Sequence, residues 1–264
     1  PILYYQGCSK ILSQKSIAIV GTRKFTTYGK RVVQFLIPEL VEAELITVSG
    51  LAFGIDTIVA EETIKNKGKT VAVLGSGLNK IYPKINQGLA EKIVQNGGVI
   101  VSEFPPDVEP QKQNFPQRNR VIAGLTKGTL VIEAPKQSGA IITAMLALGE
   151  DRFVWAVPGA IFSSQSEGCN NLIKQGAKPV LTADDVLEDL GVRTKTKTQK
   201  PVFDSKEEKL VYSVLDDSGK TVEEIAKAVS LTSSKLIAIL TMLEIKNLVQ
   251  NIGCLLYTSP SPRD

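Results

Sequence analysis

Short, continuously apolar runs recur along the first 190 residues and alternate with longer segments of helical spacing. A strand with one solvated face alternates polar and apolar residues, so unbroken apolar runs are typical of strands covered on both faces. Strand–helix alternation of this kind predicts an α/β domain with a mostly parallel sheet and helices on both faces. The predicted strands are 16–21, 45–50, 70–75, 99–104, 128–134 and 153–159, and the predicted helices are 28–44, 55–67, 86–96 and 140–150.

The composition changes after Gly191, where a charged, threonine-rich stretch predicts a solvated linker. Beyond it, three short helical patterns precede a β-ribbon, and Thr221 with Glu224 has the spacing of a capping box. This order resembles a winged helix-turn-helix. The predicted organisation is a remnant of an N-terminal region (1–15), a ligand-binding domain (16–190), a linker (191–206), a winged-helix-like domain (207–253) and a disordered or non-native tail (254–264).

The chain has no histidine, and its three cysteines, Cys8, Cys169 and Cys254, are far apart. These facts argue against histidine-dependent catalysis, a zinc site and a disulfide framework, and a reducing cytoplasm is the expected location. No apolar run approaches the roughly 20 residues of a membrane span. The formal net charge of +4 permits a polyanionic partner without requiring one. We therefore predict no catalytic residue, no cofactor, no metal and no membrane association. The first residue is not Met, so we expect an N-terminal segment to be missing.

Glycine-rich turns follow several predicted strands, and ligands of open parallel sheets bind at the carboxyl ends of strands. In Gly21-Thr22-Arg23, free amides and a guanidinium are suited to a phosphate, although a tight turn with a solvated arginine is the alternative. Gly75-Ser76 has a similar shape, but the fuller GxGxxG pattern is absent. We expect Asp56 to cap a helix rather than act as an acid.

The segment 112–120, KQNFPQRNR, combines an aromatic ring with several cations. Single-stranded nucleic acids offer base faces for stacking and regular negative charge for cations, so Lys112, Phe115, Arg118 and Arg120 are predicted to contact such a ligand. The alternative is that Phe115 belongs to the core and that the arginines cap a helix or pair with carboxylates.

Ser138 and Gly139 precede a strongly apolar helical segment, and a helix N-terminus favours anions. Thr143 lies one turn further on, where its hydroxyl could face the same pocket. Without a histidine to activate it, Ser138 is a poor nucleophile, so this turn is predicted to hold a phosphate.

At these residues the sequence resembles the DNA-processing protein A family (DprA, also called Smf), through blocks such as IAIVGTR, AVLGSGLNKIYP, NFPQRNRVIAGL and EAPKQSGAIITA. The resemblance implies a Rossmann-like core, single-stranded DNA binding, a homodimer, and loading of the RecA recombinase in natural transformation, with no catalytic step. It further implies that Arg23 and Lys112 contact DNA and that Phe115 stacks on a base. Gly75 and Ser76 match the phosphate turn, and Ser138 and Gly139 match a further contact block.

Two other functions remain open on the sequence. A nucleotide-processing hydrolase of the phosphoribohydrolase type would need a PGGxGT turn and a following glutamate, where this chain has KQSGAIITA. A transcription regulator would act through the C-terminal domain. The third helix of that domain begins Ser233-Ser234-Lys235 and carries little positive charge, which favours a protein contact over duplex binding.

Overall fold

The structure is a computed structural model that describes residues 2–192, 203–215, 220–229, 231–245, 249–253 and 256–258. The chain divides into two compact units, Pro1–Lys195 and Thr196–Asp264. Most of the predicted linker, residues 193–202, lies outside the described residues.

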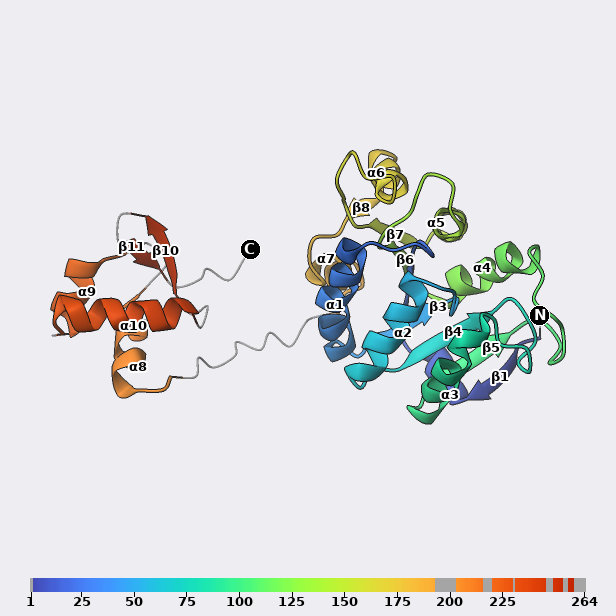
Figure 1. The fold of residues 1–264 in the computed structure, drawn as a ribbon, viewed down its shortest axis with the longest axis horizontal. Coiled ribbons are helices and arrows are strands. Elements are labelled where there is room, and N and C mark those ends of the chain that lie inside the picture. Colours follow the sequence, from blue (N-terminus) through green and yellow to red (C-terminus); the bar gives the residue numbers. More distant parts are fainter. Residues whose placement is uncertain are drawn as a thin grey trace. The chain divides into compact units, whose positions relative to one another are not determined.

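The first unit is built on one eight-stranded sheet (Figure 1). Its strands are β1 Tyr4–Gly7, β2 Ser16–Val20, β3 Ile46–Ser49, β4 Thr70–Leu74, β5 Val99–Ser102, β6 Gly128–Val131, β7 Phe153–Ala156 and β8 Lys178–Pro179. Their order is β1-β5-β4-β3-β2-β6-β7-β8, and every pair is parallel except β1 with β5. The predicted mostly parallel sheet is confirmed.

The strand order reverses beside β2. The chain builds β3, β4 and β5 outward on one side of β2 and then returns to place β6 on its other side. In doubly wound folds such a reversal leaves a crevice at the carboxyl ends of the two central strands, which is where ligands bind. The seam between β2 and β6 is therefore the expected position of a site.

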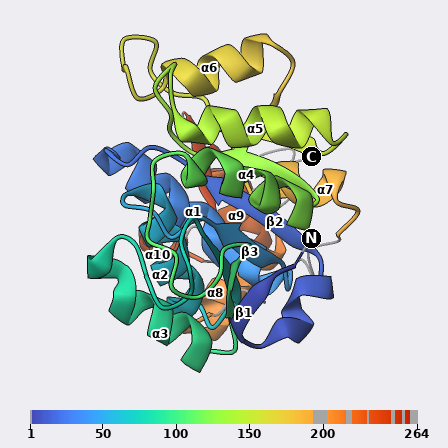
Figure 2. The same ribbon diagram turned by 90° about the vertical axis from the view of Figure 1, so that its right-hand side faces the viewer.

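Helices cover both faces of this sheet. They are α1 Thr27–Glu42, α2 Ile55–Lys65, α3 Gln87–Gln95, α4 Asn114–Leu125, α5 Gly139–Gly149, α6 Glu167–Lys174 and α7 Asp184–Asp189, with 3₁₀ turns at Ser9–Ser13 and Lys84–Asn86. Ile17 and Ile19 of β2 pack against α1, α2 and α7, whereas Ala18 and Val20 pack against α4, α5 and α6. Figure 2 shows α4 and α5 side by side. Unbroken apolar strands are thus buried on both faces, as predicted.

Five helices and strands of this unit were not predicted: β1, β8, α4, α6 and α7. Strand β1 pairs antiparallel with β5, so part of the expected N-terminal remnant belongs to the sheet. Helix α4 spans the cationic segment that the sequence analysis had not assigned to a helix, and Pro116 lies in its first turn, where the missing amide hydrogen costs no intrahelical bond. Helical geometry at α4 decides which of its cations reach the site.

The described residues of the second unit form three helices and a small antiparallel sheet of order β10-β11-β9. Its elements are α8 Lys206–Ser213, β9 Lys220–Thr221, α9 Val222–Val229, α10 Ser233–Ile245, β10 Gln250–Gly253 and β11 Leu256–Thr258. The capping box is confirmed, because Glu224 N donates to Thr221 Oγ1 at 3.3 Å and Thr221 N donates to Glu224 Oε2 at 2.8 Å. Strand β11 falls within the tail that was expected to be disordered. The assignment to the winged-helix class stays a prediction.

Over the described residues, no single helix has the length and apolar character to cross a bilayer. The segments Val222–Val229 and Ser233–Glu244 meet that test only when taken together, and they are bent by 106° at the break between them.

Candidate nucleic-acid interface

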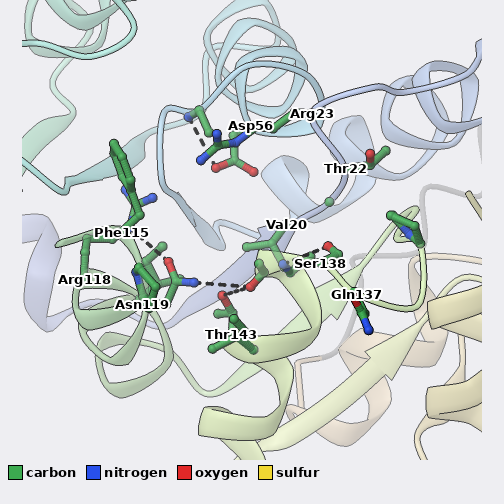
Figure 3. Close-up of a pocket in the computed structure, with 18 of the residues that line it drawn as sticks. Val20, Thr22, Arg23, Asp56, Phe115, Arg118, Asn119, Gln137, Ser138 and Thr143 are labelled. Carbon is green, nitrogen blue, oxygen red and sulfur yellow. Dashed lines mark hydrogen bonds between the residues drawn. The ribbon is translucent and has the colours of Figure 1, made fainter. Parts of the chain in front are cut away.

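A hollow of about 660 Å³ lies at the carboxyl ends of the strands, at the reversal point beside β2 (Figure 3). Its walls come from the turn after β2, the turn after β3, the first half of α4, and the segment that leads into α5. Six of the nine predicted contact residues line it together: Arg23, Lys112, Phe115, Arg118, Ser138 and Gly139. The other three, Gly75, Ser76 and Arg120, do not line it.

The turn after β2 presents two cations to the hollow. Thr22 N donates to Glu133 O at 2.7 Å, and the Glu133 carboxylate accepts from Thr26 N at 2.9 Å and Thr26 Oγ1 at 2.6 Å. Both ends of the turn are thereby fixed, while Arg23 and Lys24 are exposed. Among the described residues, neither of them forms a salt bridge with a carboxylate. Their charge is therefore available to an anion.

Phe115 sits half-buried in the first turn of α4, with one cation and one further ring against it. The Arg23 guanidinium carbon lies 5.5 Å from the Phe115 ring centroid, within the range of a cation–π contact. Tyr82 lies 5.5 Å away between ring centroids at an interplanar angle of 40°, and it is 40% exposed. Tyr82 lines the hollow too and was missed by sequence analysis. The two rings together form an aromatic wall.

The turn at Gly75 and Ser76 supports this wall instead of opening into the hollow. A Cβ on Gly75 would stand 2.7 Å from Phe115 Cδ1, so the absence of a side chain lets the ring approach the main chain. Ser76 is 1% exposed and donates to Lys80 O at 2.6 Å. The predicted phosphate contact of these two residues does not fit this place, because the turn is closed by its own bonds and covered by the ring.

Arg118 is buried, contrary to the prediction that it offers its charge to a ligand. Its side chain is at the back of the hollow, and the residue is 5% exposed. Nη1 donates to Gly50 O at 2.8 Å and to Val73 O, and Nε donates to Asn119 Oδ1 at 3.1 Å. A guanidinium engaged in this way ties α4 to the ends of β3 and β4. Its role is to position the wall.

Arg120 lies outside the hollow, which corrects its predicted role. Residues of a helix three, four and seven apart share a face, so Phe115, Arg118, Asn119 and Ile122 line the hollow together. Arg120 points to another side of α4, where it lines a separate hollow of about 580 Å³. There Nη2 donates to both carboxylate oxygens of Glu103 at 2.8 Å. Its charge is neutralised by that pair.

The segment before α5 forms the opposite wall. Ser138 is the N-cap of α5, and its Oγ accepts from Ala140 N at 3.1 Å. Thr143 Oγ1 donates to Gly139 O at 3.1 Å, and Asn119 Nδ2 donates to the same oxygen at 3.2 Å, which links α5 to α4. The N-terminal end of α5, with its partial positive charge, faces the hollow across from Phe115 (Figure 3).

Asp56 is the one acidic residue lining the hollow. Its Oδ2 accepts from Gly50 N at 2.9 Å and from Ala52 N at 3.4 Å, so it stabilises the turn after β3 and not the helix that follows, whose N-cap is Gly54. Burial raises the pKa of Asp56, while the nearby Arg118 charge opposes that rise. Burial likewise lowers the pKa of Arg118 to about 10, against the effect of Asp56. Asp56 is therefore a structural group, but the predicted helix cap is wrong, because Asp56 holds the turn after β3 and Gly54 is the N-cap of α2.

Among the described residues, no group of three histidine, cysteine, aspartate or glutamate side chains is placed to hold a metal ion. Cys169 is fully buried among the side chains of the core, and burial raises the pKa of its thiol to about 12. A thiol with that pKa is protonated at neutral pH and is a weak nucleophile.

Comparison with known proteins identifies the family to which this chain belongs. The family model described as DNA recombination-mediator protein A matches residues 1–191. The DNA processing protein DprA of Bacillus subtilis is 42% identical over 193 residues, which cover 73% of this chain and 65% of that protein. This chain thus spans just under two thirds of that relative's length.

Two solved structures are similar. DprA from Streptococcus pneumoniae superimposes with a TM-score of 0.67 at 43% identity, over 71% of this chain and 65% of that one. DNA processing protein A from Helicobacter pylori, whose structure concerns its single-stranded DNA binding mode, superimposes with a TM-score of 0.65 at 31% identity, over 71% of this chain and 86% of that one. From the sheet, the hollow and these matches, the chain belongs to the DNA recombination-mediator protein A family, also known as DprA or Smf.

Proposed function

We propose that this protein binds single-stranded DNA in the hollow beside β2. The observation that supports it most is the meeting of two cations, Arg23 and Lys112, with the half-buried ring of Phe115 in one hollow. Lys112, like Arg23, has no carboxylate partner among the residues that the structure describes. The Helicobacter pylori relative lends further support, because its structure concerns single-stranded DNA binding.

In this proposal, successive phosphates of one strand lie against Arg23, Lys112 and the N-terminal end of α5. A base from the same stretch leaves its neighbours and stacks on Phe115, next to Tyr82. Such stacking contributes about 1–3 kcal/mol per base and is tolerant of sequence. A duplex keeps its bases paired inside the helix, so it cannot offer a base face to a ring in a hollow without first being opened. The geometry therefore favours single strands.

Arg23→Ala and Lys112→Ala should each weaken the binding of an oligothymidylate and flatten its dependence on salt. Each phosphate neutralised on a single strand contributes about 0.7 to the slope of log K against log salt concentration, so each variant should lose about that much. Fluorescence anisotropy titrations over a series of salt concentrations measure both effects.

Arg120→Ala is the matched control for these variants, because it removes a cation of the same chain segment that is paired with Glu103 and lies outside the hollow. It should leave the affinity and the slope close to those of the unmodified protein. Affinity and slope that stay unchanged in both Arg23→Ala and Lys112→Ala would refute the proposed site.

The proposal includes no catalytic step. The acidic side chain in the hollow, Asp56, is buried and accepts hydrogen bonds from two main-chain amides. Ser138 caps α5 and has no histidine to activate it. Release of a free base from nucleoside monophosphates would instead support the hydrolase alternative.

Family membership supports a wider role, in which a cytoplasmic homodimer protects incoming DNA and loads the RecA recombinase onto it. The matched relatives are longer than this chain, so this role belongs to the proposal as well. Light scattering of the free protein tests the dimer. A strand-exchange assay with RecA on protein-coated DNA tests the loading, and the absence of any stimulation would contradict it.

A further inference from the structure

Two phenylalanine side chains stand exposed outside the hollow, at the same edge of the sheet. Phe25, in the turn after β2, is 42% exposed, and Phe53, in the turn after β3, is 45% exposed. Large aromatic side chains are mostly buried in folded proteins, and when exposed next to a polar rim they are common at binding sites. A single exposed ring carries little weight, so the surroundings of this pair decide its meaning.

The two turns that carry these rings are in direct main-chain contact. Ile55 N donates to Thr22 O at 3.2 Å. Gly54 has a φ of +87°, and a Cβ built on it would lie 2.3 Å from Thr22 O and 2.7 Å from Arg23 Cα. Phe53 thus directly precedes Gly54, whose backbone packs against the main chain of Arg23. Phe25 follows Arg23 by two positions along the other turn. The rings are held on one rim by a contact that only glycine permits.

The same rim carries the exposed cations of the hollow. Arg23 and Lys24, which immediately precede Phe25 in the chain, line the hollow, and so does Ala52, the residue before Phe53. Exposed rings beside cations that lack a carboxylate partner in the described part of the chain repeat the combination found at Phe115. That combination is typical of single-stranded nucleic-acid surfaces, where charge follows the backbone and rings take the bases.

We propose that Phe25 and Phe53 form a second stacking position, which takes bases of the same DNA strand after it leaves the hollow past Arg23 and Lys24. This inference rests on the proposed function. It extends the site from the hollow to the rim, so a longer strand gains contacts that a short one lacks.

The test compares two oligothymidylates, of about 4 and about 16 nucleotides, which bracket the usual site sizes of such surfaces. The double variant Phe25→Ala/Phe53→Ala should bind the long strand about tenfold or more weakly, whereas the short strand should bind as it does to the unmodified protein. Phe25→Leu/Phe53→Leu keeps apolar side chains but loses the flat ring faces, and it should behave like the alanine variant. Phe35→Ala, which removes a ring 55% exposed on α1, is the control and should change neither affinity.

Undiminished binding of the long strand by the alanine variant would overturn this inference. So would leucine variants that bind the long strand as well as the unmodified protein does, since apolar contact alone would then suffice. A change in oligomeric state without a loss of long-strand affinity would assign the rings to a protein contact and overturn it too. Failure of the unmodified protein to bind either strand would instead refute the proposed function, so the two failures are distinguishable.

Discussion

Arg118→Ala is expected to lower the free energy of unfolding of the first unit by about 3–5 kcal/mol. The guanidinium donates to Gly50 O and Val73 O at the ends of two neighbouring strands. Because Arg118 is only 5% exposed, bulk water cannot replace these hydrogen bonds to the two carbonyl oxygens. Its removal also takes away one of the two positive charges, those of Arg118 and Arg23, that oppose the desolvation of the buried Asp56 carboxylate. Denaturation in urea, followed by circular dichroism, measures the loss.

Arg120→Ala on the same helix is the control for this experiment. Its ion pair with Glu103 joins an arginine side chain that is 61% exposed to a glutamate side chain that is 18% exposed, so its loss should cost at most about 1 kcal/mol. Arg118→Lys should recover part of the stability at best, because an ammonium group has one nitrogen, whereas the guanidinium bonds both carbonyls through Nη1 and Asn119 Oδ1 through Nε. A loss below about 1 kcal/mol for Arg118→Ala would show that the strand ends hold their geometry unaided.

Phe115→Ala should weaken the binding of oligothymidylate by about 1–3 kcal/mol, which is roughly a 5- to 150-fold rise in Kd. The ring lines the hollow and is flanked by Arg23 and Tyr82, so its loss removes the surface on which a base stacks and the partner of the Arg23 guanidinium. Anisotropy titration at one fixed salt concentration measures the change. The salt slope should remain nearly constant, because no phosphate contact is removed.

Gly75→Ala should reproduce much of this loss while every predicted contact side chain stays in place. The added methyl group would come within 2.7 Å of Phe115 Cδ1, so the ring has to move off its seat. Gly88→Ala is the matched control, since a Cβ at that position meets no atom within 4 Å. Binding by Gly75→Ala at the unmodified level would mean that the position of the ring is unimportant, and the stacking role would fail.

The central strands of the sheet could be predicted from sequence because their residue pattern indicates whether one face or both faces are buried. The run around Ile17, Ala18 and Ile19 is apolar without interruption, and only a strand buried on both faces requires that. The presence of Arg23 and Ser138 in one hollow could be anticipated as well, because both follow strands whose carboxyl ends share one edge of the sheet. The sequence identified the edge of the sheet on which both residues lie, and their closeness along that edge could be inferred from it.

The cations of the segment 112–120 could not be sorted without the helix that contains them. In the linear sequence, Arg118 and Arg120 look equivalent. On α4, however, Arg118 lies at the back of the hollow, whereas Arg120 lines a separate hollow. The prolines at 110 and 116 obscured the helix, because a proline in a first turn resembles a proline in a loop. Glu133 and Gly54 were missed for a different reason, since their roles depend on residues distant in sequence.

The reversal of strand order has a consequence for how the protein holds together. One wall of the hollow belongs to the half of the sheet built from β2 to β5, and the opposite wall follows β6. A strand of DNA lying between Arg23 and Ser138 would therefore join two halves that already meet at the pairing of β2 with β6 and at the contact of α4 with α5. A ligand that binds only when β2 and β6 are paired stabilises that pairing by its binding free energy. Amide hydrogens along β2 and β6 would then exchange with solvent more slowly once DNA is bound. Bound DNA would thus stabilise the folded first unit.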